Sequence, residues 1–270
     1  MCLIAFAWRT HRRYPLALIA NRDEFHERPS AAADFDPEAA DVYGGRDFVK
    51  DGSWLQVSTH GRLATVTNVR VGPRPAEASR SRGWLVRDFV RGAGAAVEYA
   101  EALESISGEH GRFNLLLWDG AEVVFASNHP HAMHEVVTPG LHAMSNGAFD
   151  APWPKSGHAT RALDAWLASA RHGTDEIDRA ALTPLFDALA DTTAAPDALL
   201  PDTGVGIELE RALSPPFVYG ERYGTRCSSV VVVGRDRVVF AERRFGPNAA
   251  PEGESLVTLP LSVPYAAGNA

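Results

Sequence analysis

The order of apolar segments along the chain most limits the folds open to it. Short apolar runs come in pairs joined by polar turns, and two helical patterns stand together between one group of runs and the next. Single helices alternating with strands would indicate a doubly wound parallel sheet. Paired helices between hairpins instead favour antiparallel sheets with helices packed outside. The sequence therefore predicts an α+β fold.

The expected elements follow from these patterns. Five hairpins are predicted over 2–20, 54–67, 113–126, 134–145 and 230–244. Helices are predicted over 81–92, 95–106, 155–170 and 176–190, with Ser81 as the N-cap of the first. We expect loops over 31–41 and 192–216, and an edge strand after Pro247.

Composition bounds the class of protein. The chain has 270 residues, 45% of them hydrophobic, which suffices for one domain over 1–270. Its net charge of −8 and lack of basic runs argue against nucleic-acid binding. The two cysteines fit a reducing compartment. No apolar stretch is long enough to span a membrane, and arginines follow rather than precede the first apolar run, so we expect a cytoplasmic protein.

Cys2 is the first candidate for chemistry. Removal of Met1 would leave a thiol and a free α-amino group on one residue. An α-amino group has a pKa of about 7.7–8.0, so part of it is unprotonated at neutral pH and can serve as a base beside its own nucleophile. The alternative is a cysteine that stands at the start of a strand by chance.

A polar cluster, Asn21-Arg22-Asp23-Glu24, follows the second apolar run. If the runs 3–8 and 16–20 pair as a hairpin, the cluster returns beside Cys2. Asp23 would then hold or orient the α-amine, while Arg22 sets the local potential. The alternative is a solvated turn.

Several blocks of sequence, in order, resemble one family, the NRDE family, also called the transport and Golgi organisation protein 2 family. The resemblance covers residues 1 to about 245. Its blocks are Met1-Cys2-Leu3-Ile4, Asn21-Arg22-Asp23-Glu24-Phe25 with Arg28-Pro29, Gly52-Ser53-Trp54, Thr67-Asn68-Val69-Arg70, Ser81-Arg82-Gly83, Ser145-Asn146-Gly147 with Ala151-Pro152-Trp153-Pro154-Lys155, and Tyr223-Gly224-Thr225-Arg226-Cys227-Ser228.

That family is similar to N-terminal-nucleophile hydrolases, especially the bile-salt hydrolase, penicillin V acylase and acyltransferase group. The resemblance implies a four-layer αββα sandwich of two antiparallel sheets with helices outside. It also implies that Cys2 is the nucleophile and that Asp23 contacts its amino group. Asn68 would then be an oxyanion-hole residue, and Asn146 would lie near the amine.

The resemblance further places Arg226 on a late strand near the pocket, and we expect Asn21 and Arg22 to contact substrate. One feature departs from the hydrolases, which put an arginine a few residues before the aspartate, whereas here Arg22 directly precedes Asp23.

The expected chemistry is acyl transfer. Thiolate attack on a carbonyl creates an oxyanion, which an amide donor such as Asn68 would stabilise by roughly 3 kcal/mol. The sequence thus predicts a hydrolase or acyltransferase acting on an amide or thioester bond of a small acyl substrate, with no required cofactor and no metal site. Without the resemblance, Asn68 and Asn146 are turn residues at strand ends.

Two alternatives remain open. Family resemblance also implies a non-catalytic binding or trafficking protein for haem or acyl-lipid cargo, in which Cys2 is a soft ligand, and an interaction scaffold is a third possibility.

His129, His131 and His134 stand close enough in sequence to bind a transition metal or haem iron, but Pro130 indicates a solvated loop.

Overall fold

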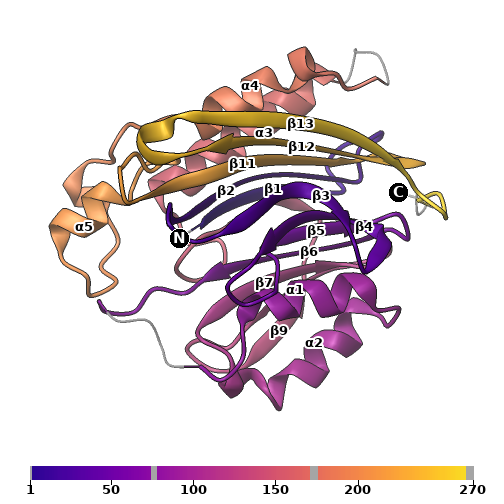
Figure 1. Ribbon diagram of the computed structural model, residues 1–270, viewed down its shortest axis with the longest axis horizontal. Coiled ribbons are helices and arrows are strands. Elements are labelled where there is room, and N and C mark those ends of the chain that lie inside the picture. Colours follow the sequence, from indigo (N-terminus) through magenta and orange to yellow (C-terminus); the bar gives the residue numbers. More distant parts are fainter. Residues whose placement is uncertain (1, 74–77, 171–175, 266–270) are drawn as a thin grey trace.

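The computed structural model describes residues 2–73, 78–170 and 176–265, apart from the side chains of Cys2 and Ala170. Within these ranges, two antiparallel sheets lie face to face and helices cover their outer faces (Figure 1). This arrangement confirms the predicted αββα sandwich.

The first sheet has, among the described residues, six strands in the order β10-β1-β2-β11-β12-β13. They are β1 (Cys2–Trp8), β2 (Leu16–Phe25), β10 (Gly140–Met144), β11 (Tyr223–Val233), β12 (Arg237–Phe245) and β13 (Pro251–Pro260). The second sheet has, over the same ranges, seven strands in the order β3 to β9. They are β3 (Ser30–Asp36), β4 (Ala39–Asp47), β5 (Leu55–Ser58), β6 (Arg62–Asn68), β7 (Phe113–Trp118), β8 (Val123–Ser127) and β9 (Met133–Val136).

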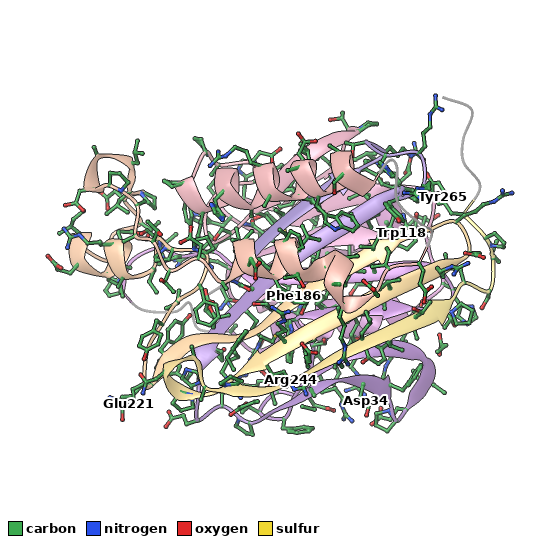
Figure 2. All side chains as sticks on the ribbon, turned by 90° about the horizontal axis from the view of Figure 1, so that it is seen from above. Asp34, Trp118, Phe186, Glu221, Arg244 and Tyr265 are labelled. Atoms are coloured by element: carbon green, nitrogen blue, oxygen red, sulfur yellow. The ribbon has the colours of Figure 1, made fainter. Side chains whose placement is uncertain are left out.

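The outer layers are helical. α1 (Arg82–Arg91) and α2 (Ala96–Glu104) pack on the second sheet, whereas α3 (Pro154–Ala170) and α4 (Arg179–Leu189) lie side by side over the first (Figure 2). A shorter helix, α5 (Ile207–Ala212), precedes β11. Short 3-10 helices occur at Ser107–Glu109, Asp197–Leu199 and Pro247–Ala249.

Capping fixes the ends of α1. The Ser81 hydroxyl accepts a hydrogen bond from the Gly83 N–H at 3.2 Å, which satisfies a donor that the first helical turn leaves free. Gly92 ends the helix. Both limits confirm the predicted helix over 81–92.

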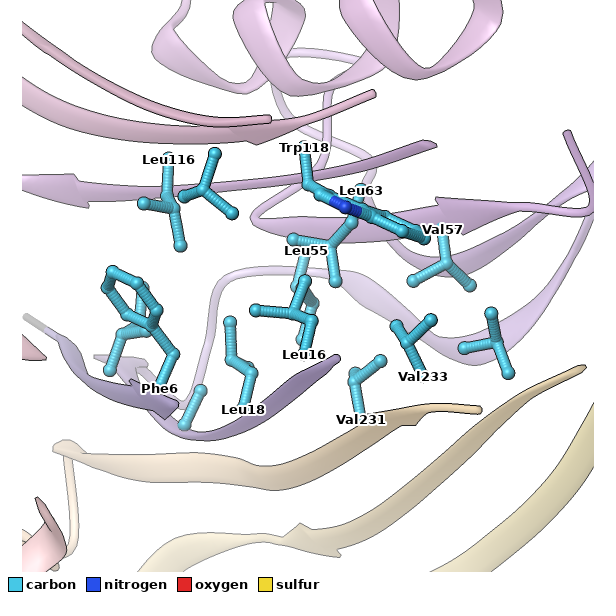
Figure 3. Packing of buried hydrophobic residues seen from close by; sticks show 14 of the residues in the cluster. Phe6, Leu16, Leu18, Leu55, Val57, Leu63, Leu116, Trp118, Val231 and Val233 are labelled. Atoms are coloured by element: carbon cyan, nitrogen blue, oxygen red, sulfur yellow. The ribbon is translucent and has the colours of Figure 1, made fainter. Parts of the chain in front are cut away.

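Strand alternation explains why the first two apolar runs are continuous. Leu16 and Leu18 of β2 point between the sheets, where they meet Phe6 and the side chains of the second sheet (Figure 3). Ala17 and Ile19 point to the other face and pack beneath α3 and α4. Because successive side chains on a strand alternate, a strand covered on both faces is apolar at every position.

Two predictions about the strands were wrong. The segment 31–41, expected to be a loop, lies within the β3–β4 hairpin. The sequence did not predict these strands because their small and acidic residues weaken the apolar alternation that is typical of a strand. The predicted hairpin over 134–145 does not form, since β9 pairs with β8 and β10 pairs with β1. The chain between these two strands therefore crosses from one sheet to the other.

The lengths of some elements also differ from expectation. The cluster Asn21-Arg22-Asp23-Glu24 lies inside β2 rather than after it, because β2 continues to pair with the long strand β11 as far as Phe25. The expected loop over 192–216 contains α5. In the ranges that the structure covers, no helix has both the length and the apolar character needed to cross a bilayer.

Candidate active site

The β1–β2 hairpin brings the polar cluster beside the start of the chain. Cys2 pairs with Arg22 of β2, and Arg22 pairs on its other side with Cys227 of β11. The predicted return of the cluster to Cys2 is thus confirmed for the backbone. The Cys2 side chain and the whole of Met1 lie outside the described residues.

Arg22 is a buried cation that stands between Cys2 and Cys227 on the three adjacent strands. Its side chain is 6% exposed, and its guanidinium carbon lies 4.2 Å from the centre of the Trp54 ring. Nη2 lies 3.8 Å from Oδ2 of Asp47, beyond hydrogen-bond distance. Among the residues described, Nη1 is buried and has no hydrogen-bond partner. A buried guanidinium with an unpartnered Nη1 can donate to a carbonyl or anionic oxygen of a ligand.

Asp23 is buried beside it, with 2% of its surface exposed. The Thr225 hydroxyl donates to Asp23 Oδ1 at 2.6 Å and accepts from the Val218 N–H at 2.9 Å. Since a hydroxyl has one proton, this arrangement aims that proton at the carboxylate. Burial raises the pKa of Asp23, against the opposing positive charges of the amino terminus and Lys155.

The two expected asparagines are joined to each other. Asn146 is 1% exposed, and its Nδ2 donates to the Asn68 carbonyl at 2.7 Å. Its own carbonyl accepts from the Arg70 N–H at 2.8 Å. Asn146 therefore holds the end of β6, where the half-buried Asn68 side chain lines a cavity.

The side chains of two other predicted residues bond backbone carbonyls. Asn21 donates to the carbonyls of Leu189 and Pro216 at 2.8 and 2.9 Å, which ties β2 to the helical layer. Arg226 donates to the carbonyls of Phe25 and Arg28 at 3.0 and 2.9 Å and supports the turn after β2. Neither residue lines the cavity that Arg22, Asp23 and Asn68 share.

This polar cavity has a volume of about 260 Å³. Its walls come from the end of β2, the segment before β5, the end of β6 and the start of α1. Cationic side chains outnumber carboxylates, so the cavity favours ligands with negative charge. Its cations are Arg22, Arg28, Lys50, Arg80 and Arg82, and its carboxylates are Asp23, Glu24 and Asp47.

The site predictions missed most of these cations and the Trp54 ring. Two of the sequence blocks that resemble the family, Gly52-Ser53-Trp54 and Ser81-Arg82-Gly83, could have indicated some of these residues, because the two blocks lie together at the cavity. The Ser53 N–H donates to the Gly83 carbonyl at 3.0 Å, and a Cβ on Gly52 would lie 2.6 Å from the Gly83 backbone. The blocks therefore need glycine because their backbones touch.

The histidine segment is separate from this cavity. His134 Nδ1 lies 2.7 Å from a carboxylate oxygen of Glu104. Throughout the described ranges, no three side chains of histidine, cysteine, aspartate or glutamate gather in a way that could hold a metal ion.

Residues 1–247 match the model of the Transport and Golgi organisation 2 family. The chain belongs to this family. The Transport and Golgi organization protein 2 homolog of Bos taurus is 31% identical over 263 residues, covering 90% of this chain and 92% of that protein. The Homo sapiens homolog is 29% identical over 266 residues, with the same coverage.

Among solved structures, the fold is similar to that of the C2A mutant of the conjugated bile acid hydrolase from Clostridium perfringens. The TM-score is 0.53, and the match covers 94% of this chain and 92% of the hydrolase. At 7% sequence identity, the likeness shows the fold alone. This family member therefore has the N-terminal-nucleophile hydrolase fold.

Proposed function

We propose that this protein is an N-terminal-cysteine hydrolase or acyltransferase that acts on an amide or thioester bond of a small acyl substrate. The observation that carries the proposal is the buried Arg22, which pairs with Cys2 in the sheet and shares a cavity with Asp23 and Asn68. The fold of a conjugated bile acid hydrolase supports it.

The reaction begins after Met1 is removed. The α-amine of Cys2 takes the thiol proton, and the thiolate attacks the acyl carbonyl. The leaving amine or thiol takes the proton from the ammonium as the tetrahedral intermediate collapses to a thioester. Water then gives its proton to the amine and attacks the thioester, releasing a carboxylic acid and restoring the thiol. In an acyltransferase, another nucleophile attacks the thioester in place of water.

The other residues stabilise charge during these steps. Asn68 and the open Nη1 of Arg22 donate to the oxyanion, and one such donor is worth roughly 3 kcal/mol. Asp23 orients the α-ammonium, with Thr225 fixing the carboxylate. Asn146 keeps Asn68 in place through its backbone. No cofactor is required by this chemistry.

A second candidate is binding without catalysis. The excess of cationic side chains around the cavity suits an anionic cargo, such as an acyl lipid or haem with its carboxylates. Such binding would not require a free amine or thiol at Cys2.

Intact mass spectrometry separates the two candidates. We expect the purified protein to lack Met1 and to gain one hexanoyl group from the hexanoyl thioester of N-acetylcysteamine. Cys2→Ala should gain none, whereas Cys227→Ala, which changes the buried second cysteine, should still be acylated. Retained Met1 with no adduct on Cys2 would refute the enzyme proposal and leave cargo binding.

A further inference from the structure

A larger cavity adjoins the polar one. It has a volume of about 650 Å³, in the range of sites that bury a small molecule. It lies between α1 and α2, at the outer helical layer. Six of its lining residues are mainly apolar: Trp84, Leu85, Tyr99, Ala102, Leu103 and Ile106.

The two cavities share three wall residues, Lys50, Ser81 and Arg80. The Trp84 indole N–H donates to the Lys50 carbonyl at 2.7 Å, which fixes the segment before β5 against α1. The shared wall is therefore built from the same segments as the polar cavity, and a ligand at this wall contacts both spaces.

Charge is distributed unevenly between the cavities. Lys50 and Arg80 stand at the shared wall, and Arg80 also pairs with Glu109 at 2.8 Å. Lys50 has no ion-pair partner within the described ranges. The exposed Asp88 and the buried His110 also line the larger cavity, where desolvation raises the pKa of the Asp88 carboxyl and lowers the pKa of the His110 imidazole. A negative group is thus favoured at the wall and an apolar group beyond it.

We propose that this pair of cavities binds an amphipathic anion, with its carboxylate at Lys50 and Arg80 and its apolar chain between α1 and α2. The inference rests on the proposed function in one respect: it identifies this anion with the acid that hydrolysis of the acyl group releases. Trp84 and Ala102, both on the cavity wall and exposed to solvent, set the length of chain that fits.

Titration calorimetry with straight-chain carboxylates tests the chain site. From hexanoate to octanoate, affinity should rise about 15-fold, because each buried methylene contributes roughly a factor of four. Ala102→Trp fills the cavity from its exposed edge and should remove this rise. Ala165→Trp, the same change at an exposed position of α3, is the matched control and should keep it. An undiminished rise in folded Ala102→Trp would overturn the assignment.

Charge reversal tests the anion site. Lys50→Glu should weaken octanoate binding by roughly fivefold, the upper range for an exposed ion pair, and leave octanol binding unchanged. Octylamine should bind more weakly than octanoate. Equal binding of octanoate, octanol and octylamine would refute the anionic preference.

These outcomes are separate from those of the acylation experiment, because carboxylate binding can be measured in Cys2→Ala. Acylation of Cys2 together with octanoate binding that Ala102→Trp does not affect would retain the enzyme and refute the cavity assignment. Chain-dependent octanoate binding without acylation would support the cavity and refute the enzyme.

Discussion

Asp23→Asn separates a catalytic carboxylate from a structural one. The amide keeps an oxygen that can accept from the Thr225 hydroxyl, now 2.6 Å from Asp23 Oδ1. It also removes a buried charge whose ionisation the fold disfavours. We therefore expect the free energy of unfolding to change by about 1 kcal/mol or less. Hydrolysis of the hexanoyl thioester should fall by about 100-fold, because the α-ammonium loses its oriented partner.

The pH dependence has a defined sign. Burial raises the folded-state pKa of Asp23 above 3.8, so its contribution to stability is fully present below that pH and is lost as pH rises through the raised pKa. Wild-type protein should therefore lose stability relative to Asp23→Asn as pH rises across this window. Urea unfolding of both proteins from about pH 3 to about pH 8 measures the difference.

The control is Asp34→Asn, which changes an exposed carboxylate on β3. It should alter neither hydrolysis nor the pH profile. If Asp23→Asn loses more than about 2 kcal/mol of stability while the folded fraction stays fully active, Asp23 has a structural role only and the reasoning fails.

Three further predictions concern neighbouring groups. Arg22→Met should keep the melting temperature within a few degrees yet slow Cys2 acylation by about 100-fold, as stopped-flow kinetics would measure, and an unchanged rate would exclude an oxyanion role. Asn146→Ala should cost about 1–3 kcal/mol in urea unfolding, because the Asn68 carbonyl loses a buried donor, and a smaller loss would mean that solvent replaces it. A hydrogen bond to Asp150 raises the pKa of His142 in the folded protein. The contribution of His142 to the free energy of unfolding is therefore full below pH 6.5 and is lost as pH rises through the raised pKa. Unfolding of His142→Gln should lack this loss, and a parallel profile would contradict it.

Local patterns predicted the parts of the fold that depend on neighbours in sequence. Apolar runs specified the β1–β2 hairpin, and the Ser81 cap with Gly92 specified α1. Pairing between β10 and β1 depends on residues more than 130 positions apart, such as Ile4 and Met144. A turn signal at Pro139-Gly140 is equally compatible with a hairpin and with a crossing between sheets, so only the three-dimensional arrangement decides.

The candidate site shows the same limit. The sequence located Asp23 and Arg22 beside Cys2 because a hairpin returns its own ends. It did not predict that Trp54 would lie under the Arg22 guanidinium, because no local pattern encodes a contact between the two sheets. Asn21 was predicted to contact substrate together with Arg22, but the two are consecutive on β2, so strand alternation turns the Asn21 side chain to the face opposite Arg22, where it bonds the helical layer.

One buried polar group, the Arg22 guanidinium, stands where apolar packing alone would favour a hydrophobic side chain. Between the sheets, Leu16 and Leu18 continue toward Arg22 along the same face of β2, so apolar packing gives way to a buried cation within one strand. A leucine or methionine there would pack against Trp54 without desolvating a charge. The Trp54 ring and the Asp47 carboxylate offset part of that cost, but Nη1 has no hydrogen-bond partner among the described residues. Such a local conflict with packing is expected where a ligand completes the hydrogen bonds, which supports the proposal of an active site at the end of β2.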